Sequence, residues 1–348
     1  MAKGDERVLT QRELNRALLA RQLLLERART PLPRALERVG GIQAQYAPSM
    51  YIGLWTRLQD FERDQLTRAL RRKTVVQGTL MRTTIHLVSK ADYWPFAVGI
   101  RRLQREWWVR VHKNLDERTV RAAAELLRPQ LAKGPMRQAG IDELLDANAA
   151  TRNGVGIFLN LVRVPPSGTW ERRRADIYAL AEKWIGPENA TENEGVDLLV
   201  RRYLQGFGPA PKADIADWAG LNIADVTAAV ERIELRRFRD EAGKELFDLP
   251  RAPLPDPETP APPRLLPTWD ATLLVHARRT QVLPEHYRER VFHVKVPQSV
   301  STFLVDGQVA GTWKYDKGTV ELNPFHRLDR ATRRELDDEA ERLAAFQA

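Results

Sequence analysis

The 348-residue chain contains no cysteine. It therefore cannot form disulfides, thiolate zinc sites or iron–sulfur clusters, and it cannot use a thiol as a catalytic nucleophile. None of its six histidines stands in the HxH or HExxH spacing of a metal site. A glycine-rich phosphate loop and a GxSxG turn are missing as well. We therefore expect no metal and no cofactor, and if the protein is an enzyme, its substrate must need little activation.

Long hydrophobic runs are also missing. No stretch approaches the ~18 apolar residues that span a bilayer, and the charged residues 1–8 lack the apolar centre of a signal peptide. We expect a cytoplasmic, nucleoid-associated protein with no membrane contact. Its 43% hydrophobic and 29% charged residues are typical of a soluble globular protein. At ~150 residues per domain, the length predicts two to four domains.

Basic residues exceed acidic ones. The chain has 55 lysines and arginines against 46 aspartates and glutamates, a net charge of +9. Such an excess is typical of proteins that bind a polyanion such as nucleic acid. A soluble but merely basic surface accounts for it equally well, so charge alone leaves both interpretations open.

Three segments share one order of elements, in which short helices precede a pair of strands. This order is typical of a winged helix-turn-helix. Two of the helices begin with a capping box, at Thr10 and Glu13 and at Thr191 and Glu194. The strand pairs are predicted over residues 75–80 and 84–88, within 162–170, and over 234–239 and 245–249.

The last quarter of the chain has a different pattern. A proline-rich linker over residues 250–263 precedes predicted strands over 272–276, 301–305, 309–314 and 319–322, and a final helix capped at Thr332. The sequence thus predicts an α+β fold with three tandem winged helix-turn-helix domains and a C-terminal β domain. The predicted boundaries are 1–113, 114–190, 191–255 and 264–348.

Two glutamines stand in an unusual place between two predicted helices. Gln43 and Gln45 follow Gly40 and Gly41, and an extended backbone would turn both amides to the same face. Taken alone, this spacing is weakly specific. Glutamines at such positions commonly satisfy free backbone groups at helix ends.

The segment around these glutamines resembles the bacterial winged-helix DNA glycosylases of the AlkZ/YcaQ type, in the branch that carries Gln-x-Gln and confers azinomycin resistance. Three further segments are similar to the family's first hairpin, the start of its C-terminal domain and its second hairpin. The similar segments are residues 42–55, 80–88, 265–274 and 304–313. One departure is visible: the family's first hairpin usually reads Arg-Gly-Thr, and this chain has Arg82-Thr83-Thr84.

The resemblance implies three winged helices and a β-barrel-like C-terminal domain around a DNA channel. It also implies excision of N7-alkylated purines from double-stranded DNA, including bulky adducts and interstrand crosslinks. We assign Gln43 and Gln45 as the catalytic pair that positions water and stabilises an oxocarbenium-like transition state. Because no lysine stands next to them, we expect a monofunctional enzyme without a Schiff-base step, and we expect a monomer.

Several other residues are candidates for DNA contacts. Arg82, Thr84 and His86 alternate on a strand and are predicted to share its outward face. Two arginine runs fall at or near the second and third wings, and one turn joins two C-terminal strands. These further candidates are Arg172, Arg173, Arg236, Arg237, Asp306, Gly307 and Gln308.

Each candidate also has a plain structural interpretation, as a solvated wing face, a surface charge run or an ordinary hairpin turn. The protein as a whole has rivals too. Tandem winged helices with a basic surface are also typical of a transcription regulator, and a catalytically silent DNA-binding scaffold is a third interpretation. Release of N7-methylguanine from DNA distinguishes the enzyme from both.

Overall fold

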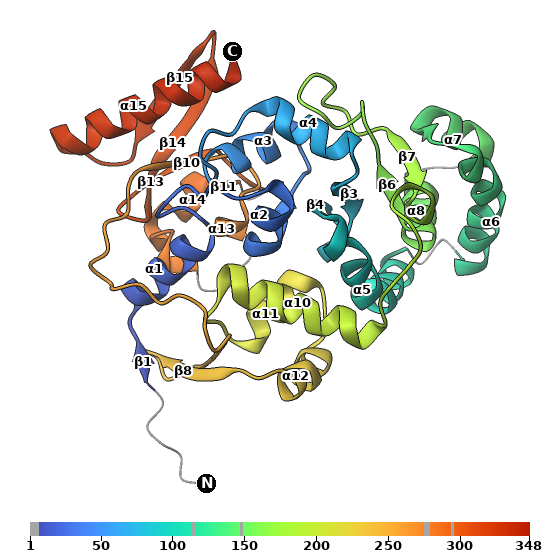
Figure 1. The fold of residues 1–348 in the computed structure, drawn as a ribbon, viewed down its shortest axis with the longest axis horizontal. Helices are drawn as coiled ribbons and strands as arrows, with labels where there is room; N and C mark the ends of the chain where they lie inside the picture. The colour runs from blue at the N-terminus through green and yellow to red at the C-terminus, as the bar shows by residue number, and fades with distance from the viewer. Residues whose placement is uncertain (1–6, 113–115, 147–148, 275–278, 294–295) are drawn as a thin grey trace.

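A computed structural model describes residues 7–112, 116–146, 149–274, 279–293 and 296–348 (Figure 1). It confirms a mixed α+β fold. The helices are α1 (Gln11–Arg21), α2 (Leu32–Val39), α3 (Ala47–Trp55), α4 (Arg63–Arg71), α5 (Lys90–Val111), α6 (Glu117–Lys133), α7 (Gln138–Leu145), α8 (Ala149–Leu159), α9 (Ala181–Trp184), α10 (Glu192–Phe207), α11 (Lys212–Ala219), α12 (Ile223–Arg232), α13 (Ala271–Leu274), α14 (Arg288–Val291) and α15 (Arg330–Gln347).

The described strands form four sheets. They are β1 (Val8–Leu9), β2 (Ile42–Gln43), β3 (Val75–Thr79), β4 (Ile85–Ser89), β5 (Met136–Arg137), β6 (Leu161–Arg163), β7 (Ile177–Leu180), β8 (Arg236–Asp240), β9 (Glu245–Asp248), β10 (Arg264–Leu266), β11 (Phe292–His293), β12 (Val296–Ser299), β13 (Thr302–Val305), β14 (Gln308–Asp316) and β15 (Thr319–Pro324). The helical capping boxes at Thr10 and Thr191 are present as the sequence predicts.

The largest sheet joins the first two predicted wings. Its order is β2-β4-β3-β6-β7-β5, and every neighbouring pair is antiparallel. The sheet therefore continues across the predicted boundary at residue 113. The third hairpin, β8-β9, stands apart and gains the N-terminal strand β1 as a parallel neighbour. The separation into three winged-helix domains stays a prediction.

Helices α5 and α10 pack closely at the centre of the molecule (Figure 1). Their backbones approach at two glycines, because a Cβ atom on Gly99 would lie 2.7 Å from the carbonyl carbon of Gly195. Since any larger side chain would separate the helices, these glycines set the contact distance. The contact joins the first predicted domain to the third in one hydrophobic core.

Two buried ion pairs link segments that lie far apart in the sequence. Arg57 binds both carboxylate oxygens of Asp270 at 2.9 Å, and Arg21 binds those of Asp248 at 2.6 and 3.0 Å. Pairing of this kind offsets the desolvation cost of a buried charge. The first pair ties the end of α3 to the C-terminal region, and the second ties α1 to β9.

The C-terminal region departs from the barrel expected from the resemblance. Its described strands form an open four-stranded sheet of order β10-β13-β14-β15 beside the pair β11-β12. The expected barrel-like closure is therefore not confirmed among the described residues. The long helix α15 covers this sheet, with Leu336 and Leu343 buried (Figure 1).

Three local predictions are wrong. The predicted strand over 272–276 begins as helix α13, because Asp270 accepts the backbone N–H of Thr272 and starts a turn; its last two residues lie outside the described part. The final helix is capped by Asp329, one turn before Thr332. The second hairpin returns at β7 and not within 162–170, since Pro165 and Pro166 lack the N–H groups of a strand ladder.

Candidate functional site

The two glutamines lie at the edge of the six-stranded sheet. Gly40 and Gly41 have φ angles of 80° and 81°, a left-handed conformation that ends α2 and turns the chain into β2. β2 pairs with β4, with Gln43 opposite His86, and the Ala44 N–H donates to the Ile85 carbonyl at 2.7 Å. The sequence Gly-Gly-Ile-Gln thus places Gln43 in a strand instead of at a helix end.

Gln43 and Gln45 have different surroundings. The Gln43 residue is 6% exposed, and its amide has no hydrogen-bond partner in the described part of the chain. Gln45 is exposed, and its Oε1 accepts the Ile85 N–H at 3.0 Å, which extends the strand ladder by one bond. The Nε2 group of Gln45 remains free to donate. The Gln43 side chain is therefore nearly enclosed, and the amide of Gln45 is fixed to the backbone at the surface.

His86 is buried, so the prediction that it shares an outward face with Arg82 is wrong. Its exposed fraction is 3%, and Nδ1 lies 3.1 Å from the Thr84 carbonyl oxygen. Burial, with the charge of Arg82 as a second cause, lowers the pKa of His86 to about 3. The imidazole is therefore neutral near pH 7 and offers no charge to a phosphate. The Thr84 hydroxyl donates to the Met81 carbonyl at 3.0 Å, inside the same turn.

The turn between β3 and β4 has an unusual backbone. Arg82 and Thr83 both adopt left-handed conformations, with φ angles of 52° and 58°. A β-branched residue in this region is a genuine outlier, and Thr83 occupies the position where the resembled family has glycine. The departure in the sequence therefore coincides with local strain, and the turn keeps its left-handed form without the glycine.

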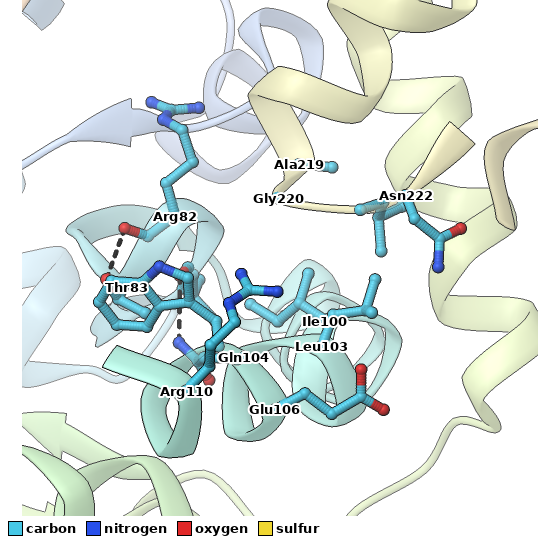
Figure 2. Close-up of a pocket in the computed structure, with 13 residues that line it drawn as sticks. Arg82, Thr83, Ile100, Leu103, Gln104, Glu106, Arg110, Ala219, Gly220 and Asn222 are labelled. Atoms are coloured by element: carbon cyan, nitrogen blue, oxygen red, sulfur yellow. Dashed lines mark hydrogen bonds between the residues drawn. The ribbon is translucent and has the colours of Figure 1, made fainter. Parts of the chain in front are cut away.

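Arg82 crosses to another part of the molecule. Its guanidinium donates to the carbonyl of Trp218 near the C-terminus of α11, where the helix dipole favours a cation. A cavity of about 360 Å³ lies between this turn, α5 and the α11–α12 connection. Figure 2 shows Arg82 and Thr83 on one side of it and Gly220 and Asn222 on the other.

Of the arginines in the second wing, Arg173 lies beside the glutamine segment. Its Nη1 donates to the hydroxyl of Tyr46, which follows Gln45, at 3.2 Å. Arg172 instead pairs with Asp176 at 3.0 Å. The loop between β6 and β7 thus brings one predicted DNA contact next to the candidate catalytic pair.

The third wing and the C-terminal turn lie elsewhere. Arg236 is held by the buried Asp248 at 2.7 Å, whereas Arg237 is exposed and pairs with Glu245 at 2.9 Å. Asp306 and Gly307 form the turn between β13 and β14, but this turn is docked on α1. Arg12 and Arg16 bind the Asp306 carboxylate, and Asn15 donates to the Gly307 carbonyl at 2.8 Å. Gln308 is exposed beside it.

The contacts of the Asp306 turn with α1 affect its predicted role in DNA binding. Burial acts to raise the pKa of Asp306, but the two arginines outweigh it and hold that pKa below its usual value. Contact of this turn with a DNA groove would compete with its bonds to α1. Its DNA contact, like those of Arg236 and Arg237, stays a prediction.

The sequence did not reveal the long helix α5 or the functional residues that it supplies. Helix α5 is capped at its N-terminus by Ser89, whose side chain accepts the Asp92 N–H at 3.1 Å. This Ser-x-x-Asp cap was the available signal, and Pro95 inside the helix obscured it. Trp107 and Trp108, near the end of α5, line a second cavity, and Gln45 is also part of its lining.

Within the described ranges, no group of three or more histidine, aspartate or glutamate side chains is placed to hold a metal ion. None of the helices in those ranges is long and apolar enough to cross a membrane.

Comparison with known proteins gives two matches. The sequence profile of the AlkZ-like DNA glycosylases matches residues 36–346. The fold is similar to that of the DNA glycosylase AlkZ from Streptomyces sahachiroi, with a TM-score of 0.82 and 18% sequence identity, over 98% of this chain and 97% of that one. No curated protein sequence matches the chain.

Proposed function

Because the chain belongs to the family of AlkZ-like DNA glycosylases, we propose that it is a monofunctional enzyme that hydrolyses the N-glycosidic bond of cationic N7-alkylpurines in double-stranded DNA. The proposal extends to bulky adducts and interstrand crosslinks, which carry the same cationic N7-alkyl linkage. Gln43 and Gln45 are the proposed catalytic pair.

The chemistry of the substrate fits the residues at this site. An N7-alkylated purine already carries a positive charge, so its bond to the sugar breaks without protonation of the base. The electron pair of the C1′–N9 bond passes to the base, which becomes neutral. The oxygen of a water molecule bonds to C1′ and releases a proton to solvent. The protein must then orient the water and stabilise an oxocarbenium-like sugar.

Glutamine amides suit this task. An amide carbonyl is too weak a base to deprotonate water in the ground state, but it can accept a hydrogen bond and fix the position of the oxygen. Positioning can contribute several kcal/mol, against a ceiling of about 7–11 kcal/mol for a fully oriented reaction. The negative end of the amide carbonyl dipole also stabilises the positive charge that develops on the sugar.

The observation that carries the proposal is the placement of the Gln43 side chain. A nearly enclosed amide that makes no hydrogen bond to the described part of the chain can hold one water in a fixed position. Gln43 is 6% exposed and lacks a described partner. A bound water would satisfy the amide, and Gln45 lies two residues further along the same edge.

Arg173 is the strongest candidate for a DNA contact. It lies within hydrogen-bond distance of Tyr46, beside the glutamines, at the surface. A guanidinium at this place can bind a phosphate near the lesion without entering the reaction. Phosphate contacts position the duplex, so Arg173→Gln is expected to weaken binding of damaged and undamaged DNA alike.

A single-turnover assay tests the proposal. Duplex DNA containing N7-methylguanine is mixed with excess protein, and release of the base is followed over time. The wild-type protein is expected to release the base, and the Gln43→Ala, Gln45→Ala double variant to release it far more slowly. A matched control is Gln59→Ala, an exposed glutamine away from the site. No release by the wild-type protein, or equal rates for both proteins, would contradict the proposal.

A further inference from the structure

The second cavity lies between the six-stranded sheet and the ends of α5 to α8. Its volume is about 370 Å³, within the range of small-molecule sites. β3, β4, β6 and β7 supply lining residues on one side, and α5, α6, α7 and α8 supply them on the other. Gln45 and Thr83 lie on its lining. The cavity therefore adjoins both the proposed catalytic pair and the strained turn.

The lining combines aromatic and aliphatic walls. Trp107, Trp108 and Tyr178 provide aromatic surfaces, and Ile85 and Ile157 are among the aliphatic side chains. Trp107 is 39% exposed, which is unusual for a tryptophan in a soluble protein. Flat aromatic walls favour a flat aromatic ligand, because such rings stack on one another.

Arg163 gives this cavity an unbalanced positive charge. Its Nη1 donates to the Thr79 hydroxyl at 3.0 Å, and its guanidinium lies 5.3 Å from the ring centre of Tyr178. The Nε atom is buried without a partner, and no described carboxylate pairs with this arginine. Burial lowers the pKa of Arg163, so the charge is held at a cost.

Trp108 forms an enclosed part of the wall. The residue is 1% exposed, and its ring stacks on His112 with the ring centres 4.8 Å apart. Its Nε1 and the Nε of Arg163 are both enclosed by protein, so neither atom is available to a ligand. A ligand in this cavity would meet the aromatic rings and the outer part of the Arg163 guanidinium.

We propose that this cavity binds the purine base of the lesion, with its ring against the aromatic walls and an acceptor atom facing the guanidinium of Arg163. The inference rests on the proposed function and adds the place where the base is held. Purines present ring nitrogens and, in guanine, a carbonyl oxygen as acceptors.

The charge of Arg163 has a consequence for the reaction. It repels the cationic base before cleavage and does not repel the neutral base afterwards. An interaction that improves as the bond breaks lowers the barrier. The cavity should therefore bind free N7-methylguanine, which is neutral at pH 7, and high concentrations of that base should inhibit turnover.

Gly156 allows a direct test of the cavity. This residue on α8 lines the cavity, and a Cβ atom added to it would meet no atom within 4 Å. Gly156→Leu therefore adds a side chain to the cavity wall at a position where its Cβ atom meets no neighbour. Gly140→Leu is the matched control, since Gly140 lies on the neighbouring helix α7, outside the lining, and its Cβ would meet only Met136 at 4.0 Å.

Binding of free N7-methylguanine to the full chain is measured by equilibrium dialysis. We expect Gly156→Leu to weaken it at least tenfold and Gly140→Leu to leave it unchanged, with thermal stability preserved in both. Arg163→Gln is a second variant, expected to weaken binding by a similar factor while affinity for undamaged duplex stays the same. Equal binding by the wild-type protein, Gly156→Leu and Arg163→Gln, or no binding by any of them, would overturn the inference.

Single-turnover release from N7-methylguanine duplex shows when the base enters. If Gly156→Leu slows release as well, the cavity holds the base during cleavage; if it weakens only binding of the free base, the cavity holds the product. Both results support the site. Failure of the proposed function gives a different pattern, in which the wild-type protein releases no base from DNA although Gly156→Leu still abolishes dialysis binding.

Discussion

Gln43 and Gln45 are two residues apart, and their amides make different contacts. Gln45 accepts a backbone N–H from Ile85, so part of its role is to extend the sheet edge. Gln43 makes no such bond within the described chain and is nearly buried. The sequence predicted that both amides act together, and the geometry now allows their contributions to be separated.

We expect Gln43→Ala to slow base release about 10- to 150-fold, which corresponds to loss of a hydrogen bond worth ~1.5–3 kcal/mol in the transition state. The free energy of unfolding should change little, because no described bond is lost.

Gln45→Ala should slow release and also lower stability by about 1 kcal/mol, since the Ile85 N–H loses its acceptor. Single-turnover kinetics and urea unfolding measure the two effects. A large stability loss in Gln43→Ala with unchanged kinetics would show a purely structural role.

His86 makes stability depend on pH. Its pKa is lowered to about 3 in the folded protein, while an unfolded histidine titrates near 6.5. Between these values the unfolded chain binds the extra proton, so the free energy of unfolding falls as pH decreases, by about 1.4 kcal/mol per pH unit.

The check is urea unfolding of the wild-type protein and His86→Gln from pH 7 to pH 4.5. The variant should lose less stability than the wild type over this range. His326→Gln, which removes an exposed imidazole, is the matched control. Parallel curves for wild type and His86→Gln would mean that the buried imidazole is not the titrating group.

Among the elements, the β3–β4 turn stores backbone strain next to both cavities. A left-handed conformation costs an ordinary residue about 1–2 kcal/mol, and glycine avoids this cost. Thr83, at φ 58°, carries this conformational cost, and it lines the second cavity together with Gln45. Strain of this kind is concentrated at functional sites.

Thr83→Gly should therefore raise the free energy of unfolding by about 0.5–1 kcal/mol. Thr84→Gly is the control with the opposite sign: Thr84 has φ −103° and donates to the Met81 carbonyl, so glycine there adds flexibility and removes a bond. Urea denaturation of both variants measures the difference. A loss of stability in Thr83→Gly would show that the threonine makes contacts outweighing the strain.

Elements differed in how well the sequence predicted them. The strands around Asp306–Gly307 and the helices after Thr10 and Thr191 carry local signals, a hairpin turn and two capping boxes. Helix α5 was missed because Pro95 and a run of large aromatic residues obscured its apolar period. The return strand β7 was missed because the loop before it is held by distant groups, such as Gln77 bonding the Gly168 carbonyl.

At the scale of the whole molecule, the net charge of +9 suits a long anionic partner. If ~4–6 phosphates are neutralised, the logarithm of the DNA association constant should fall with the logarithm of salt concentration at a slope of about −4 to −5. Fluorescence anisotropy with undamaged duplex between about 50 and 200 mM salt measures this slope. Arg173→Gln should make the slope shallower by about one. Affinity that is independent of salt would contradict binding along the DNA backbone.

The sequence by itself determined the α+β class, the strands of the first and third hairpins and the glutamine pair, because caps, turns and alternating apolar residues act within a few positions of the chain. It also gave the resemblance that the family profile later matched over residues 36–346. The tertiary structure decided what those residues face. It buried His86, docked Asp306 on α1, merged two wings into one sheet and placed Arg163 and Trp108 on a cavity beside Gln45. Burial and ion pairing depend on segments up to hundreds of residues apart, and no local pattern encodes which of them meet.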